Sequence, residues 1–363
     1  MKITIETSKL QELSSKAIKG SGRSPLLAVT MFMSIEGVNG NLTLTTTDRI
    51  NTLAVVGKGV IKEKEENFYT CVDSDLFNKL VSKTTSKEII LEVTENCLMF
   101  KGNGVYSLPI AVDERNIVVR IPNFPVELKE SKEEEISVSK LKDILTFNKP
   151  SIAKTMEKPE YTGYFIDKEG VITYNEITAC VNKTEMPINK ALIPYNLAEL
   201  FSIITTEKAF IKMNDKRILI EAGDVIINGA LMEQVDLFPA APLRDLINST
   251  FESECEINRI ELVNALDRLS LFIGEGEKNA IRLAFGENNL TISSKKSNGN
   301  ELLNYIKCKD VKPFTELIDI LDLKNQLQTQ SGETVTLCFG NEKGLMLKLN
   351  NVSQLISYLD DEE

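Results

Sequence analysis

The chain of 363 residues is long enough for two or three ordinary domains, and its 42% hydrophobic content lets each domain bury a core. Its net charge of −11 argues against tight binding of nucleic acid, which needs clustered cations to displace the counterions of phosphate. The complete absence of histidine excludes Ser-His and Cys-His catalysis and the usual zinc sites.

The chain lacks the marks of a membrane, secreted or nucleotide-binding protein. No apolar stretch approaches the roughly 18 residues that cross a bilayer, and residues 1–12 lack the apolar segment of a signal peptide. The six cysteines are scattered without a Cys-x-x-Cys pair, which indicates reduced, mostly buried thiols. Neither G-x-G-x-x-G after a strand nor a Walker-type loop occurs. We therefore expect a cytoplasmic protein with no cofactor and no metal site.

A strand that runs straight into a helix opens the chain. Residues 2–6 (KITIE) predict the strand, and residues 8–19 (SKLQELSSKAIK) predict an amphipathic helix with Ser8 as its N-cap. An Asn-Gly turn then opens a hairpin over residues 39–48 (NGNLTLTTTD), in which Leu42 and Leu44 face one way. A second helix, followed by three strands with polar turns, completes the unit.

The same order of elements returns twice, at intervals of about one third of the chain. Residues 135–139 (EISVS) and 255–258 (CEIN) each lead into a helix, as residues 2–6 do. The hairpin pattern recurs at residues 168–176 (KEGVITYNE) and 286–295 (GENNLTISSK). Chance similarity between α+β domains is the alternative explanation, and the agreement in order and spacing disfavours it.

The closing segments support the same division. The first two copies end on Phe-Pro, at residues 124–125 and 238–239, and polar or proline-bearing linkers follow them. In the third copy the helix from residue 259 should bury one stripe that includes Ile260, Val263 and Leu266. The pattern predicts an α+β fold of three tandem domains, at residues 1–125, 126–245 and 246–363, each with two helices packed on antiparallel sheets.

This layout resembles the bacterial β sliding clamps, the processivity factors of DNA polymerase III. The resemblance is carried by MKITIE and its helix, and by four later segments: GRSPLLAV (22–29), LTLTTTD (42–48), VDLFPAAPLRDL (235–246) and NALDRLSLFIGEGEKNAIRL (264–283) with NLTISS (289–294) behind it. It spans the whole chain in layout, with sparse residue identity. The abundance of lysine, asparagine and isoleucine would suit a viral or plasmid-borne version, such as a phage-encoded one, working in the bacterial or infected-host cytoplasm.

The resemblance implies a head-to-tail homodimer that closes into a six-domain ring, with helices around a hole through which duplex DNA passes. Partners would be the polymerase and the clamp loader, bound through short peptide motifs, and the protein would not be an enzyme. An acidic chain is compatible with this role, because topological linkage holds the duplex without tight contacts.

The resemblance and the helix positions together suggest which cations face the DNA. Arg23 matches a DNA-contacting arginine of the family, and Lys149 and Lys154 occupy the corresponding second-domain loop. Each is open to a second interpretation as an ordinary solvated cation. The remaining candidates lie on predicted helices: Lys9, Lys16, Lys79, Lys83, Lys140, Arg259 and Lys324.

The family also has an apolar groove that binds partner peptides. Here the segment TYNEITA (173–179) lacks the family's histidine and arginine, and the chain ends in ISYLDDEE, so the groove is either absent or suited to other peptides. Carried over by position, it comprises Thr173, Tyr174, Asn175, Ile177, Ala179, Pro239, Pro242, Leu243, Ile356, Tyr358 and Leu359.

Ring closure would add the strand at residues 104–110 (GVYSLPI) edge to edge onto a third-domain strand of the neighbour. Phe272 and Ile273 are open to a second interpretation, as core residues of their own helix. The usual basic and acidic clusters are thin, which weakens a charge-based register. The expected interface residues are Lys101, Tyr106 and Leu108 on one side and Phe272, Ile273 and Glu301 on the other.

Three functions remain to be separated. The first is a non-catalytic DNA clamp. The second is a monomeric docking protein with the clamp fold that does not encircle DNA, which the thin interface charges and the acidic balance favour. The third, a metal-dependent hydrolase using carboxylates alone, is disfavoured by the missing histidine and by the lack of metal-ligand spacing.

Overall fold

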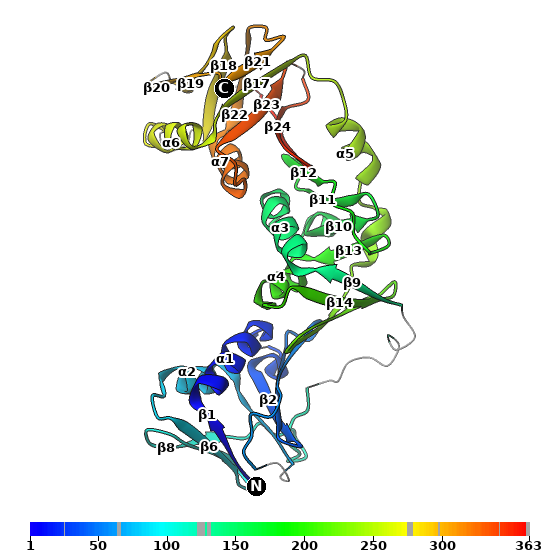
Figure 1. Ribbon diagram of the computed structural model, residues 1–363, viewed down its shortest axis with the longest axis vertical. Helices are drawn as coiled ribbons and strands as arrows, with labels where there is room; N and C mark the ends of the chain where they lie inside the picture. Colours follow the sequence, from blue (N-terminus) through cyan, green and yellow to red (C-terminus); the bar gives the residue numbers. More distant parts are fainter. Residues whose placement is uncertain are drawn as a thin grey trace. The chain divides into compact units, whose positions relative to one another are not determined.

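The computed structural model forms two compact units, and each combines a large antiparallel sheet, a smaller one and helices packed on them (Figure 1). One unit comprises Met1–Ser139 with Asn196–Leu231, and the other Lys140–Tyr195 with Met232–Glu363. The structure describes residues 1–24, 26–63, 67–121, 128, 132–273, 279–296, 298–340 and 342–360.

The first unit holds a four-stranded and an eight-stranded sheet among its described residues. The smaller runs in the order β1 (Lys2–Glu6), β6 (Glu88–Val93), β7 (Cys97–Lys101) and β8 (Val105–Pro109). The larger runs in the order β5 (Phe68–Asp73), β2 (Phe32–Val38), β3 (Asn41–Thr47), β4 (Thr52–Gly57), β16 (Val225–Ala230), β15 (Arg217–Ala222), β14 (Lys208–Met213) and β9 (Glu133–Ser137).

The second unit holds a nine-stranded and a four-stranded sheet in the part of the chain that is described. The larger runs in the order β13 (Ala191–Pro194), β10 (Gly163–Asp167), β11 (Gly170–Tyr174), β12 (Thr178–Asn182), β25 (Val352–Ile356), β24 (Leu345–Leu349), β23 (Thr334–Phe339), β17 (Ser253–Asn258) and β21 (Lys307–Lys309). The smaller runs in the order β20 (Asn300–Asn304), β19 (Asn289–Ser294), β18 (Ala280–Phe285) and β22 (Phe314–Asp319).

The succession of strand and helix confirms the predicted repeat. Within the described ranges, β1, β5, β9, β13, β17 and β22 each pass directly into a helix. In Figure 1, α1 and α2 lie side by side in the first unit, as α6 and α7 do in the second. The helices that follow these strands are α1 (Thr7–Ala17), α2 (Ser74–Lys83), α3 (Val138–Asn148), α4 (Tyr195–Glu199), α6 (Arg259–Ser270) and α7 (Ile320–Thr329).

The hairpin prediction is confirmed as well. Leu42 and Leu44 are both fully buried on β3, and Asn39 and Gly40 adopt the positive φ angles of 51° and 80° that a tight hairpin turn requires. The equivalent hairpins are β10–β11 and β18–β19. The Phe-Pro closure at residues 124–125 lies outside the described residues.

Two local predictions are wrong. Ser8 is not an N-cap, because α1 begins at Thr7 and the Ser8 hydroxyl donates to the Glu6 carboxylate (2.5 Å). Ile260 is exposed rather than buried, because the buried face of α6 starts two positions later, at Leu262. That face comprises Leu262, Ala265, Leu266 and Leu269.

The predicted linker after Phe238-Pro239 instead contains a helix, α5 (Ala240–Ile247). Leu243 and Ile247, four residues apart, are buried on one face of it and pack with Phe238 in an apolar cluster. Pro242 is compatible with this helix because it lies in the first turn, where a missing N–H removes no helical hydrogen bond.

Both large sheets continue from one repeat into the next. In the first unit β4 pairs with β16, and in the second unit β12 pairs with β25. The middle repeat therefore contributes β9 and β14–β16 to one sheet and β10–β13 to the other. Because the middle repeat contributes strands to both large sheets, the border between the two compact units falls within residues 126–245. The three predicted domains, 1–125, 126–245 and 246–363, therefore stay a prediction.

Thiol reactivity should separate the cysteines by burial. Cys71, Cys180, Cys255 and Cys338 are free and buried, and burial raises the pKa of Cys71 to about 12, whereas Cys308 is exposed. Because a thiol must be reachable and ionised to react, we expect Cys308 to react with a maleimide or disulfide reagent before the four buried thiols, which should react only on unfolding. Mass spectrometry of the labelled native protein checks this, and rapid native labelling of Cys71 would contradict it.

Candidate nucleic-acid interface and partner surfaces

The loop that carries Arg23 is held in place on both sides. It leaves α1 through a short 3-10 turn, and Gly22 is required because a Cβ there would lie 2.9 Å from the Asp48 Cα. The Ser21 hydroxyl and the Arg23 backbone amide both donate to the Thr30 carbonyl, at 2.7 and 3.2 Å. These contacts hold Arg23 at a φ of +50°, in the left-handed region that most side chains avoid.

The first turn of α2 approaches this loop. Asp73 caps the helix by accepting a hydrogen bond from the Leu76 amide (2.7 Å), and the Ser74 hydroxyl lies 3.1 Å from that of Ser21. Asp75 follows in the same turn. Its half-exposed position beside the loop is therefore fixed by a capped helix.

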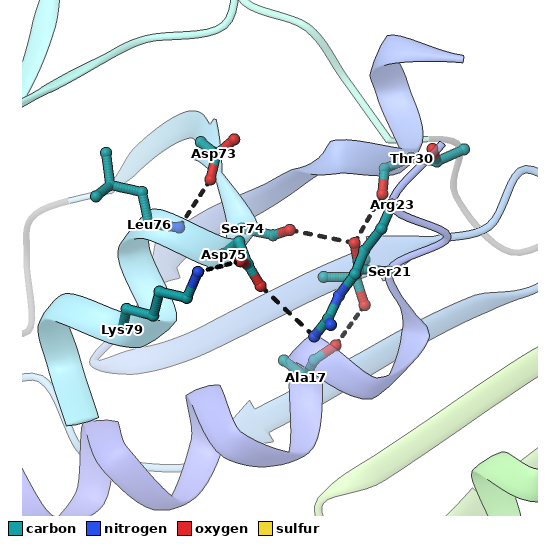
Figure 2. A network of polar contacts seen from close by, with 10 residues as sticks. Ala17, Ser21, Arg23, Thr30, Asp73, Ser74, Asp75, Leu76 and Lys79 are labelled. Atoms are coloured by element: carbon teal, nitrogen blue, oxygen red, sulfur yellow. Dashed lines mark hydrogen bonds and ion pairs between the residues drawn. The ribbon is translucent and has the colours of Figure 1, made fainter. Parts of the chain in front are cut away.

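Asp75 bridges two cations, as Figure 2 shows. Its carboxylate lies 2.6 Å from the Lys79 ammonium and 3.5 Å from the Arg23 guanidinium. The hydrogen bond from Lys79, together with the charges of Lys79 and Arg23, lowers the pKa of Asp75. Both cations were predicted to face DNA, and both share one carboxylate.

Lys16 is also matched by carboxylates. Its side chain is only 13% exposed and lies 2.6 Å from Asp224 and 3.1 Å from Glu12. Burial opposes the charged form, but hydrogen bonds to Asp224 and Glu12 outweigh it and raise the pKa of Lys16. Lys9 and Lys83 are exposed, and neither forms an ion pair among the described residues.

In the second unit the predicted cations differ in environment. Lys140, Lys149 and Lys154 are exposed, and the Lys149 ammonium lies 5.4 Å from the centre of the Tyr195 ring. Lys324 pairs with Asp267 across α6 and α7.

Arg259 is occupied by backbone. Its Nε donates to the Gly332 carbonyl (2.5 Å) and its Nη1 to the Leu327 carbonyl (3.3 Å), at the end of α7. Leu327 lies in the last turn of α7, where the carbonyls lack i+4 helical partners, and Gly332 lies just beyond the helix. Arg259 therefore stabilises the fold.

The groove residues on β11 and β12 point in different directions. Thr173 and Ala179 are buried, and the Thr173 hydroxyl donates to the Asn148 carbonyl (2.8 Å). Asn175 shapes the turn between the strands by accepting from the Ile177 and Thr178 amides, at 3.1 and 2.6 Å. This turn presents Ile177 with 48% of its surface exposed.

The other groove residues lie around two apolar clusters. Tyr174 packs edge to face on Tyr161, with ring centres 5.0 Å apart, in the cluster that buries Leu243. Pro239 precedes the first turn of α5, and Pro242 is exposed on the helix. This part of the predicted groove therefore combines a buried apolar cluster with the exposed first turn of α5.

The final segment of the chain lies beside the Ile177 turn. The Ser357 amide donates to the Ile177 carbonyl (2.9 Å), and Ile356 is fully buried. Tyr358 packs against Phe314, and burial raises the pKa of its hydroxyl. The Leu359 amide donates to the Leu317 carbonyl (2.9 Å). These contacts bring two parts of the predicted groove together within the second unit.

The strand predicted to close a ring, β8, is an edge strand with two exposed apolar residues. Tyr106 is 45% exposed and Val105 is exposed beside it, whereas Leu108 is buried. The Lys101 ammonium lies 2.5 Å from Glu92 on the same sheet. The charge of Lys101 is thus already balanced within the unit.

Strand β20 is the corresponding edge in the second unit. Leu302 on this strand is 61% exposed, and Phe272, just after α6, is 51% exposed. Ile273 instead packs against the core. Glu301 accepts two hydrogen bonds from the Arg268 guanidinium, at 2.6 and 2.9 Å.

Sequence reasoning missed several residues of these surfaces. Val105, Leu302 and Leu271 are exposed apolar residues at the two edges. Alternation along NELLN (300–304) could have identified Leu302, since its neighbour Leu303 is the buried one. The i,i+4 spacing of Asp75 and Lys79 could have indicated their ion pair, whereas the contact of Asp75 with Arg23 could not be read because Arg23 lies on another element.

No protein-family model matches the sequence, and no curated protein matches it either. Solved structures do. The DNA polymerase sliding clamp of Bacillus subtilis matches with a TM-score of 0.86 at 16% identity, covering 99% of both chains. DNA polymerase III subunit beta of Borrelia burgdorferi, in complex with a natural product, matches with a TM-score of 0.85 at 16% identity, covering 99% of this chain and 98% of that one. The DNA polymerase III beta subunit of Thermotoga maritima matches with a TM-score of 0.82 at 14% identity, covering 99% of both chains.

The chain has the fold of the bacterial β sliding clamps, with three repeated α+β domains. The likeness covers nearly the whole chain and confirms the resemblance inferred from the sequence. The low identity makes it a divergent example of the fold.

Proposed function

We propose that the protein is a DNA sliding clamp: two copies close head to tail into a ring around duplex DNA and tether a replicative polymerase. The main support is the match to sliding clamps over 99% of the chain with TM-scores of 0.82 to 0.86. The exposed apolar edges β8 and β20 offer the surfaces that such a ring would join. The three repeats would span residues 1–125, 126–245 and 246–363.

In this proposal the protein works in the bacterial or phage-infected cytoplasm, binds the polymerase and clamp loader through short peptides, and catalyses no reaction. The matched structures include a DNA polymerase sliding clamp and a beta chain of DNA polymerase III. No helix in the described ranges has the length and apolar character needed to span a membrane.

Retention on circular DNA tests the clamp directly. Loaded onto a nicked circle, the protein should stay bound through gel filtration and leave when the circle is cut open. Release through the cut ends is the behaviour that topological linkage requires. Protein that remains on cut DNA, or never associates with circles, would contradict the proposal.

The second candidate is a monomeric docking protein with the same fold. It is favoured by one observation: Lys101 and Glu301, the charges expected to set the register of a dimer, both pair within their own unit. Mass in solution separates the two candidates. A stable 40.6 kDa species at micromolar concentration supports the monomer, and about twice that mass supports the ring.

The groove makes a separate prediction. Ile177 is the exposed apolar residue of its turn, so Ile177→Asp should weaken a polymerase-derived peptide at least tenfold, about 1.4 kcal/mol, with little change in unfolding. Titration calorimetry with the peptide measures this. Val38→Asp is the control, since Val38 is an exposed apolar residue on β2. Equal affinity for both variants would place the peptide elsewhere.

A further inference from the structure

We infer that Asp75 is a built-in competitor for DNA phosphate: its carboxylate occupies Arg23 and Lys79 when no phosphate is present and yields them to the backbone of a passing duplex. The inference rests on the proposed clamp function and adds the residue that limits its grip on DNA.

The geometry supplies the first argument. One carboxylate contacts two cations from different elements, at 2.6 Å to Lys79 and 3.5 Å to Arg23. A phosphate group carries the same charge and a similar pair of oxygens, so it fits the same two donors. All three side chains are more than one third exposed, so a phosphate can reach them without rearrangement of the core.

The backbone at Arg23 supplies the second argument. A φ of +50° costs a non-glycine residue of the order of 1 kcal/mol, and glycine would adopt it without strain. Glycine already occupies position 22, next to Arg23 in the same loop. A long cationic side chain at the strained position therefore indicates a use for the guanidinium beyond folding.

The ion pairs of Asp75 are weak enough for a DNA phosphate to replace the carboxylate reversibly. Exposed ion pairs contribute roughly 0 to 1 kcal/mol, so a phosphate can displace Asp75 at little cost. Once displaced, the carboxylate repels the phosphates beside it, which keeps each contact brief. Carboxylates also match the cations at Lys16 and Lys324, so the same balance recurs elsewhere among the predicted DNA-facing cations.

The test compares Asp75→Asn with a matched control. Glu88→Gln changes the net charge equally and breaks a similarly exposed pair with Lys62, remote from the Arg23 loop in sequence. Binding of each protein to a fluorescent linear duplex is measured by anisotropy over a range of salt concentrations. Circular dichroism during heating checks that each variant is folded.

Asp75→Asn should bind the duplex at least threefold more tightly than the wild type, and its log-log salt dependence should steepen by about 1 to 2, because up to two cations become available to phosphate. Glu88→Gln should change neither by more than a small factor. Equal effects of the two variants would overturn the inference, since net charge alone would then explain them.

Arg23→Gly provides an independent check. It should unfold at the same or a higher temperature than the wild type, because the left-handed strain is relieved, and yet bind the duplex more weakly. Unchanged binding by a folded Arg23→Gly protein would also overturn the inference. Retention of the wild type on circular DNA decides the clamp function separately, so the two failures are distinguishable.

Discussion

Phe272→Asp should convert the proposed head-to-tail dimer into monomers. The phenyl ring of Phe272 is half-exposed in the isolated chain, and burying it in an interface would contribute about 1 to 2 kcal/mol to dimerisation. An aspartate at this position would also have to lose its hydration. A head-to-tail ring of two chains contains this interface twice, so the loss counts twice. We expect the dimer dissociation constant to rise at least a hundredfold.

Analytical ultracentrifugation from nanomolar to micromolar concentration measures the shift. Leu302→Asp should act in the same direction, because Leu302 lies exposed on the β20 edge. Met156→Asp is the control, since Met156 is 70% exposed and lies in a loop that belongs to neither β8 nor β20. An unchanged mass distribution for both edge variants would exclude these edges from ring closure.

Phe339→Ala should be among the most destabilising single changes in the second unit. Phe339 is fully buried and stacks on Phe285 with ring centres 3.7 Å apart, and Phe314 packs beside it. Loss of a buried phenylalanine ring typically costs about 3 to 5 kcal/mol, because the cavity collapses only in part. The free energy of unfolding should fall by that amount.

Urea denaturation followed by circular dichroism measures the change. Phe210→Ala is the matched control, because Phe210 lies exposed on β14 and should cost less than about 1 kcal/mol. A loss below that value for Phe339→Ala would mean that the cluster does not hold the C-terminal sheets together.

The repeat of strand and helix was predictable because several of its strand–helix junctions carry local signals. Asp73, Asn258 and Asp319 end a strand, and each accepts a hydrogen bond from an amide in the first turn of the helix that follows. The alternation of apolar and polar residues along β3 likewise predicted that Leu42 and Leu44 are buried. Signals of this kind lie within a few residues of sequence, so one chain suffices to read them.

Contacts between distant segments were not predictable in this way. Lys16 was assigned to a DNA-facing helix surface, yet Asp224, more than 200 residues later, lies beside it. Helical periodicity reports which face a residue occupies and says nothing of the charge on a neighbouring strand. The same limit applies to Thr173 and Ala179, which a positional transfer placed on a groove wall and which the sheet buries.

The pairing of β12 with β25 also bears on where the polypeptide can be divided. A fragment ending at residue 245 would leave β12 with unsatisfied amides and carbonyls along five residues, from Thr178 to Asn182. Such a fragment would present a template for intermolecular sheet growth and would precipitate at concentrations where the intact chain stays dissolved. Cutting this polypeptide at residue 245 would therefore divide one continuous sheet into two sheets with exposed, aggregation-prone edges.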